Sequence, residues 1–224
     1  KNNQENKMKK NVKPFGMSDK IGYAAGDIGN NFTFFLVSSF LMLFYTDVWG
    51  IEPKTVGTLF VVSRIVDAFT DVGMGTIVDR FAGNKDGKFR PFLKWGAIPV
   101  ALAAFLLFQS GLKDLSYVTK LVVMYITYIF WGSICYTFIN IPYGSMASAI
   151  TPEADQRTEL STFRTLGSTI AQLGIGFVTP FLIYKKVAGQ PDLLLADRFP
   201  LVAGLYGILA VISYFVCYKL AVER

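Results

Sequence analysis

The 224-residue chain contains no histidine, only two cysteines and no phosphate-binding glycine loop. The absence of histidine excludes a histidine proton relay and a histidine metal site. The absence of a Gly-x-x-x-x-Gly-Lys-Ser/Thr segment excludes that loop as a means of driving work with ATP. Cys135 and Cys217 both lie in apolar segments, which indicates neither a disulfide framework nor a zinc site. Because no nucleophile–base pattern is visible either, we predict that the chain is not an enzyme and needs no cofactor.

Charge is also scarce, at 17% of the residues against 52% hydrophobic ones. Uncharged runs cover 28–46, 95–112, 121–152, 165–184 and 199–218. A helix needs about 20 mostly apolar residues to cross a bilayer, whereas strands of membrane barrels are about 9–11 residues long and alternate in polarity. We therefore predict an all-α membrane protein over residues 20–222, with spans at about 20–46, 54–78, 92–112, 119–149, 161–185 and 199–221.

Basic residues are distributed unequally between the two ends of this predicted bundle. Residues 1–19 form a polar, lysine-rich tail without an apolar core, which argues against a cleaved signal peptide. Apart from Arg64 and Arg164, fourteen lysines and arginines lie on the side of the termini and six on the other. Because the basic side is normally cytoplasmic, we expect both termini inside. This topology accounts for the net charge of +6, and we expect no nucleic-acid partner.

The second predicted span carries three charges inside an apolar segment: Arg64, Asp67 and Asp71. Their spacing of three and four residues places them on one helical face, with Thr70 at its edge. Each charge costs roughly 2.5–3.5 kcal/mol near the centre of a membrane helix, which favours an ion or substrate pathway. Alternatively, Arg64 pairs with one carboxylate and fixes helix packing. One negative charge then remains, which suits a monovalent cation.

Other predicted spans contain isolated polar side chains. In the first span, small residues at 22, 25, 26 and 29 allow close helix packing, and Asp27 and Asn31 share one face. We expect Asn31 to contact substrate, while Asp27 either joins it or hydrogen-bonds a neighbouring helix. In the fourth span, Pro142 interrupts the backbone bonding beside Thr137 and Asn140, which is typical of helices that line a cavity.

Arg164 opens the fifth span, and two interpretations of it remain. It extends toward the aqueous edge, or it donates paired hydrogen bonds to a sugar or carboxylate in a polar cavity. Between the second and third spans, Gly75, Asp79 and Arg80 precede a basic, glycine-rich turn that ends near Arg90. Gly-x-x-x-Asp-Arg followed by such a turn resembles the loop signature of the major facilitator superfamily. That resemblance implies a cytoplasmic charge clamp between neighbouring helices.

Taken in order, residues 18–222 resemble the amino-terminal half of the glycoside–pentoside–hexuronide:cation symporter family, which includes the melibiose permease. The resemblance rests on five segments: Gly-Asp-Ile-Gly-Asn-Asn-Phe at 26–32, Phe-Tyr-Thr-Asp-Val at 44–48, Arg-Ile-Val-Asp-Ala-Phe-Thr-Asp at 64–71, Gly-Lys-Phe-Arg-Pro-Phe at 87–92 and Asn-Ile-Pro-Tyr-Gly at 140–144. It implies a multi-pass protein of the bacterial inner membrane and cation-coupled symport of a sugar.

The resemblance also implies roles for individual residues. Asp67 and Asp71 match the two acids that bind the coupling cation, Na⁺ or H⁺. Thr70 stands where the family has an asparagine, and Thr137 matches a threonine of the fourth helix. Substrate residues correspond to Asn31, Tyr136, Asn140 and Arg164, with asparagine where the melibiose permease has two sugar-binding carboxylates. This departure is closer to glucuronide and xyloside carriers than to galactoside carriers.

Family members have twelve helices in two halves that rock around a central site. We therefore expect a second six-helix half, in the same protein or in another chain, as a partner beside sugar, cation and membrane lipid. A cation-coupled lipid or lysolipid carrier of the same architecture is one alternative, and it predicts a lateral apolar slot. A channel subunit or non-transporting half-module is another. Asn31, Tyr136 and Asn140 favour sugar.

Overall fold

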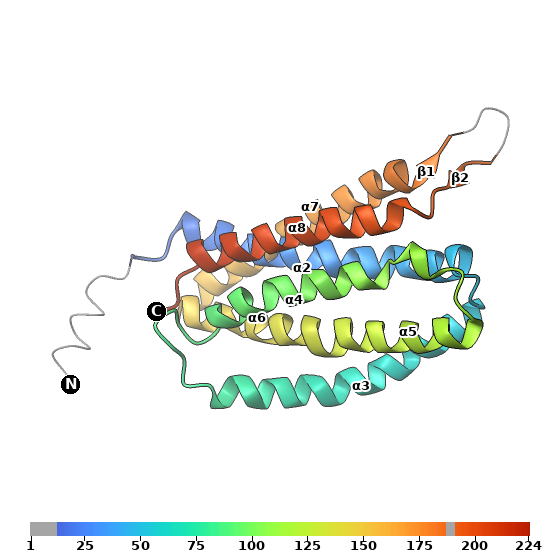
Figure 1. Cartoon of the computed structure of the whole chain (residues 1–224). Helices are drawn as coiled ribbons and strands as arrows, with labels where there is room; N and C mark the ends of the chain where they lie inside the picture. The colour runs from blue at the N-terminus through green and yellow to red at the C-terminus, as the bar shows by residue number, and fades with distance from the viewer. Residues whose placement is uncertain (1–12, 187–190) are drawn as a thin grey trace.

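Long helices packed side by side make up the chain, as the computed structural model shows for residues 13–186 and 191–224 (Figure 1). The first part of the predicted basic tail, residues 1–12, lies outside this range. The elements are α2 (Met17–Leu43), the π-helical turn η1 (Phe44–Val48), α3 (Pro53–Arg80), α4 (Arg90–Leu107), the 3₁₀ turn η2 (Ser110–Leu112), α5 (Tyr117–Ile129), the π-helical turn η3 (Phe130–Tyr136), α6 (Thr137–Ile150), α7 (Ala154–Ile183), β1 (Tyr184–Lys185), β2 (Leu193–Leu194) and α8 (Arg198–Leu220).

Five helical segments in the described part of the chain are long and apolar enough to cross a membrane: Met17–Val48, Arg90–Leu107, Tyr117–Ile150, Ala154–Ile183 and Arg198–Leu220. The third combines α5, η3 and α6 into one continuous helix. Helix α3 has 28 residues, enough for a span at 1.5 Å per residue, but its charges lower its hydropathy. The predicted all-α membrane fold is confirmed, and α3 is the helix that carries its internal charges.

Element boundaries differ from the predicted spans at three places. Helix α4 ends at Leu107 rather than near 112, because the backbone leaves the α-helical conformation at Phe108 and Gln109 and a separate 3₁₀ turn, η2, follows. Helix α7 starts at Ala154, about two turns before residue 161, with Glu153 at its N-cap and Asp155 in the first turn. Acidic residues stabilise this end of a helix whether or not it lies within a membrane. A two-stranded antiparallel hairpin, β1–β2, joins α7 to α8.

Small residues of α2 bring its neighbours close, as their spacing predicted. A Cβ at Gly22 would lie 2.7 Å from the backbone nitrogen of Ala221, and one at Gly26 would lie 2.3 Å from the ring of Tyr143. Helix α2 thereby packs against the end of α8 and against α6, while α7 runs along its other side (Figure 1). The tight contact fixes the side chains of α2 relative to those of α6 and α7.

Candidate functional site

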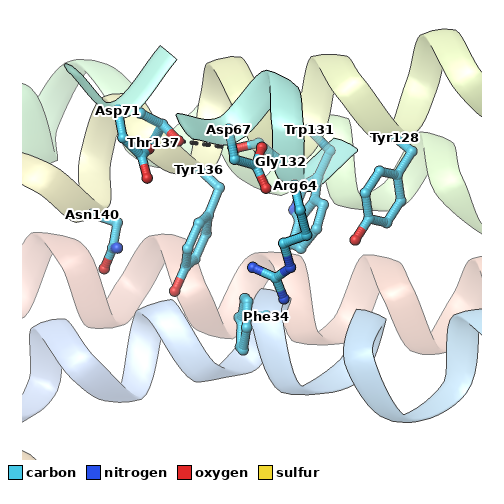
Figure 2. A pocket seen from close by; sticks show the side chains of 10 residues that line it. All are labelled: Phe34, Arg64, Asp67, Asp71, Tyr128, Trp131, Gly132, Tyr136, Thr137 and Asn140. Atoms are coloured by element: carbon cyan, nitrogen blue, oxygen red, sulfur yellow. Dashed lines mark hydrogen bonds between the residues drawn. The ribbon is translucent and has the colours of Figure 1, made fainter. Parts of the chain in front are cut away.

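A cavity of about 270 Å³ lies between α3, η3 and α6 and reaches α2. Charged, hydroxyl, amide and aromatic side chains share its wall, which is lined by Phe34, Arg64, Asp67, Asp71, Tyr128, Trp131, Gly132, Tyr136, Thr137 and Asn140. Figure 2 shows Asp67 and Asp71 on the α3 side, with Phe34 across the space and Asn140 at one end. We call this space the carboxylate cavity.

Two hydrogen bonds join the cavity's carboxylates to the helix formed by α5, η3 and α6. The Ser133 hydroxyl donates to Oδ1 of Asp67 at 2.5 Å, and the Thr137 hydroxyl donates to Oδ1 of Asp71 at 2.8 Å. Asp67 and Asp71 are four residues apart on α3, and Ser133 and Thr137 are four residues apart on the neighbouring helix, so each pair lies on one helical face. Both bonds join residues 66 apart in sequence, as expected for parallel neighbouring helices. Helix geometry therefore presents the two acids and the two hydroxyls as matched rows.

Thr70 and Arg64 sit differently from what the sequence suggested. The Thr70 hydroxyl donates to the backbone carbonyls of Val66 and Asp67, at 3.2 and 3.1 Å, and does not line the cavity. Arg64 does line it. However, no ion pair within 4.0 Å joins Arg64 to either carboxylate in the described part of the chain. The predicted Arg64–Asp pair is therefore not formed here, and hydroxyl groups satisfy the acids instead.

Two of the predicted substrate residues, Tyr136 and Asn140, belong to the carboxylate cavity. The ring of Tyr136 stacks on Phe34 with centroids 5.3 Å apart. Asn140 accepts a long, 3.5 Å hydrogen bond from Asn30 of α2, whose own side-chain oxygen accepts a bond from Tyr214 at 2.8 Å. The cavity thus presents an amide and an aromatic face beside the two acids.

The other three predicted substrate residues form a separate cluster between α2 and α7. Nε of Arg164 donates to Oδ1 of the buried Asp27 at 2.8 Å, while the Arg164 side chain itself is 41% exposed. Asn31 donates to the backbone oxygen of Asp27 at 2.9 Å and to its Oδ2 at 3.2 Å, and accepts from Gln172 at 2.9 Å. We call these four residues the α2–α7 network. None of them lines the carboxylate cavity, so the predicted substrate residues fall into two separate groups.

The predicted clamp residues are also separated from one another. Asp79 and Arg80 are exposed at the end of α3, and open space surrounds Gly75. Arg90 instead bonds the backbone oxygen of Tyr218 through Nε at 2.9 Å and through Nη2, and lies over the Tyr218 ring. It therefore ties α4 to α8, whereas Asp79 and Arg80 make no ion pair within the described residues.

Beside Arg90, residues after α8 close the end of the bundle that holds the chain's C-terminal residue (Figure 1). The Glu223 carboxylate accepts the backbone N–H groups of residues 88, 89 and 90 at the start of α4, at 2.6–2.9 Å. Arg224 pairs with Asp19, which is 1% exposed, at 2.9 Å. We call Asp19, Glu223 and Arg224 the terminal clasp. An anion at a helix start is favourable because unpaired N–H groups point at it.

Sequence reasoning missed Ser133, Gln172 and Glu223. Ser133 precedes Thr137 by four residues, as Asp67 precedes Asp71, and this shared spacing was the available signal. Gln172 follows Arg164 by eight residues, about two helical turns, and so lies on the same face of α7. Glu223 carried no local signal, because its partners are backbone groups more than 130 residues away.

Comparison with known proteins relates the sequence of this chain to sugar transport proteins. A family model described as "MFS/sugar transport protein" matches residues 22–224. The chain is 34% identical over 199 residues to the "Glucuronide carrier protein homolog" of Escherichia coli, covering 89% of this chain and 42% of the relative. It is 37% identical over 209 residues to the "Putative glycoside/cation symporter YagG" of E. coli (93% and 44%), and 36% identical over 219 residues to the "Isoprimeverose transporter" of Lactiplantibacillus pentosus (96% and 43%). The chain therefore spans less than half the length of these relatives.

Proposed function

This chain belongs to the MFS/sugar transport protein family, and on that premise we propose that it forms the cation- and sugar-binding half of a cation-coupled sugar symporter. One observation carries the proposal: two carboxylates of α3, each bonded to a hydroxyl of the neighbouring helix, share a cavity with an amide and stacked aromatic rings. Charged side chains within spans of membrane proteins typically mark ion or substrate pathways. The names of relatives include a glycoside/cation symporter, which supports the same reading.

The carboxylate cavity suits a small, hard cation. Asp67, Asp71 and Thr137 contribute oxygen atoms, the ligands that hard cations prefer. Two acids and Arg64 leave one net negative charge on the wall, which one monovalent cation neutralises. Na⁺ fits this oxygen set, while H⁺ needs a single carboxylate. Dependence of uptake on Na⁺ or on a proton gradient distinguishes them.

The amide and aromatic part of the wall suits a sugar. The Asn140 amide can both donate to and accept from hydroxyl groups, and the Phe34–Tyr136 pair offers an apolar face. Relatives named for a glucuronide and for isoprimeverose support a glycoside as the substrate class. Arg164 alone would favour a uronate, but its charge is matched by Asp27. We therefore favour an uncharged glycoside or xyloside over a glucuronide.

A second six-helix bundle completes the proposed transporter. Helices α3 and α7 carry the half-exposed Arg164 and the exposed Arg64 beside rows of exposed apolar side chains, namely Val61, Ile65, Phe69, Val72, Leu166, Ile170, Leu173 and Phe177. Charged groups within membrane spans face a protein interior or water rather than lipid. We propose that this surface meets the second bundle across a wet cavity, with both termini of the present chain on the cytoplasmic side of a bacterial inner membrane. The excess of lysine and arginine residues on the side of the termini supports that orientation.

The alternative lipid carrier is less well supported. A groove of about 380 Å³ between α4 and α8 is lined by apolar residues, but none of the predicted cation or substrate residues lines it. The carboxylate cavity, by contrast, is polar and charged. A lipid tail gains nothing from such a wall, because burying unpaired charge against hydrocarbon is costly.

The test is uphill accumulation of a labelled glycoside by the complete transporter. We expect Asp67→Asn and Asp71→Asn each to abolish accumulation, because each removes a cation-binding charge, while exchange of labelled sugar without a gradient persists. Asp114→Asn, which changes an exposed loop carboxylate, is the matched control and should accumulate sugar normally. Normal accumulation in both cavity variants would refute cation coupling through this site.

A further inference from the structure

Ser133 differs from most helical hydroxyl residues of this chain in where its hydroxyl points. Serine and threonine in helices usually donate to a backbone carbonyl three or four residues earlier. Ser63, Thr70 and Thr127 all do so here. Ser133 instead donates across to Asp67 on the neighbouring helix, and within the described residues this is its one hydrogen bond. The hydroxyl is therefore directed into an interhelical contact.

Local backbone structure accompanies this orientation. Ser133 lies inside η3, where backbone bonds span five residues instead of four. Such turns within α-helices are frequent at functional sites. Thr137, which directly follows the turn, also donates across to Asp71, and in addition to the Gly132 carbonyl at 3.2 Å. The π-helical turn thus holds two hydroxyls in register with the two acids of α3.

We propose that Ser133 is a positioning residue of the coupling-cation site, holding Asp67 as Thr137 holds Asp71. This inference rests on the proposed function and deepens it. Thr70 has no such role, because its hydroxyl is bound to its own helix and lies outside the cavity wall. Ser133 thus has the supporting role that the sequence of α3, read by itself, had suggested for Thr70.

The chemistry of a hydroxyl suits this role. Its single donor hydrogen bonds the Asp67 carboxylate and so fixes the direction in which that carboxylate points, without Ser133 itself entering the cavity. The side chain is only 2% exposed, so water cannot replace the bond readily. Without the hydroxyl, the carboxylate loses a charge-assisted bond, and a cation has to order Asp67 as it binds.

The experiment measures cation dependence in the complete transporter reconstituted in vesicles. Sugar uptake is titrated with Na⁺ at fixed pH and, separately, driven by a proton gradient without Na⁺; the cation that drives the wild type is then used for the variants. We expect Ser133→Ala to raise the half-saturating cation concentration about tenfold, equivalent to ~1.4 kcal/mol. The sugar KM at saturating cation should stay within about twofold, because Ser133 does not line the cavity wall.

Two controls separate positioning from general packing. Ser63→Ala removes an equally buried hydroxyl that donates to the Leu59 and Phe60 carbonyls of its own helix and contacts neither Asp67 nor Asp71, and it should leave the cation dependence unchanged. Ser133→Thr keeps the hydroxyl and should restore most of the wild-type cation dependence. Should Ser133→Ala fail to reach the membrane, Ser133→Cys keeps a similar volume with a weaker donor and is expected to shift the dependence in the same direction.

An equilibrium measurement provides a readout that does not require transport. Trp131 lines the cavity, so adding the driving cation alone to the purified transporter (Na⁺ at fixed pH, or H⁺ by lowering the pH) should change tryptophan fluorescence, with a weaker apparent affinity in Ser133→Ala. A wild type that couples sugar to a cation while Ser133→Ala and Ser63→Ala behave alike would overturn the inference and leave the proposed function standing. A wild type driven by neither Na⁺ nor a proton gradient would overturn the proposed function, and the inference with it.

Discussion

Removing the charge of Asp27 should change which sugars the transporter prefers. In the α2–α7 network, Asp27 is almost fully buried and lies 2.8 Å from Nε of Arg164. An approaching uronate therefore meets a neutral pair rather than a free cation. Asp27→Asn is nearly isosteric and leaves the Asn31 bond to the backbone oxygen of residue 27 available, so the main change is one uncompensated positive charge at Arg164.

The size of the effect follows from the geometry. Two unit charges ~4 Å apart interact by roughly 4 kcal/mol at an effective dielectric of about 20. The Arg164 side chain is 41% exposed, however, and exposed pairs are worth only about 0–1 kcal/mol. An intermediate value of ~1.4 kcal/mol corresponds to about a tenfold change in relative affinity. Uronates should gain by about that factor, while uncharged glycosides should change little.

Competition measures this directly. Uptake of one labelled xyloside is challenged with unlabelled xylosides and glucuronides, and the ratio of half-inhibitory concentrations is compared between the wild type and Asp27→Asn. Arg164→Gln and the double variant provide the matched comparison: Arg164→Gln leaves Asp27 uncompensated and should disfavour glucuronides, while the double variant, whose pair is again neutral, should return to about the wild-type ratio. A ratio that is the same in the wild type and Asp27→Asn would refute the assignment of charge selectivity to this pair.

Two further predictions concern assembly. Asp19→Asn should lower the free energy of unfolding in detergent by about 2–4 kcal/mol, because it breaks a buried ion pair. Glu159→Gln, at a pair with Lys20 in which the Glu159 side chain is 51% exposed, should cost less than about 1 kcal/mol. Equal melting temperatures of the two variants would contradict the clasp. Residues 1–224 expressed alone should insert in the membrane but transport nothing. A second six-helix bundle supplied as a separate chain should then restore uptake. Sugar accumulation by the 224-residue chain alone would contradict the two-bundle arrangement.

The parts of the fold that could be predicted are those with local causes. Long uncharged runs specify helices because a spanning segment must satisfy its own backbone bonds. The spacing of Asp67 and Asp71 specifies a shared face for the same reason, since helical geometry alone determines it. Both acids lie on the wall of the carboxylate cavity. None of this required knowledge of which helices are neighbours.

The partners of these side chains could not be predicted in the same way. Arg64 was the nearest cation in sequence to Asp67, yet the acid bonds a serine from a helix 66 residues further on. Arg164 donates a hydrogen bond to Asp27, 137 residues away in the sequence, and Gln172 donates one to Asn31, 141 residues away. Such pairings depend on how close α2, α3, α6 and α7 approach. Burial of glycines against large neighbours, as at Gly26, determines that approach only once the whole bundle has formed.

Adjacent asparagines of α2 connect the two halves of the candidate site. Successive helical residues differ by about 100° in direction, so Asn30 and Asn31 point to different neighbours. Asn31 joins the α2–α7 network, while Asn30 contacts Asn140 on the wall of the carboxylate cavity at 3.5 Å. The Asn30–Asn140 bond is long and weak, because hydrogen bonds of this kind are normally near 2.9 Å. This bond therefore contributes little by itself, and the tight packing of Gly26 on Tyr143, with the 2.7 Å bond from the Tyr143 hydroxyl to the Tyr23 carbonyl, holds α2 against α6 instead. The Asp67–Ser133 and Asp71–Thr137 bonds hold α3 to the α5–η3–α6 helix in turn, so the two parts of the candidate site are joined through α6.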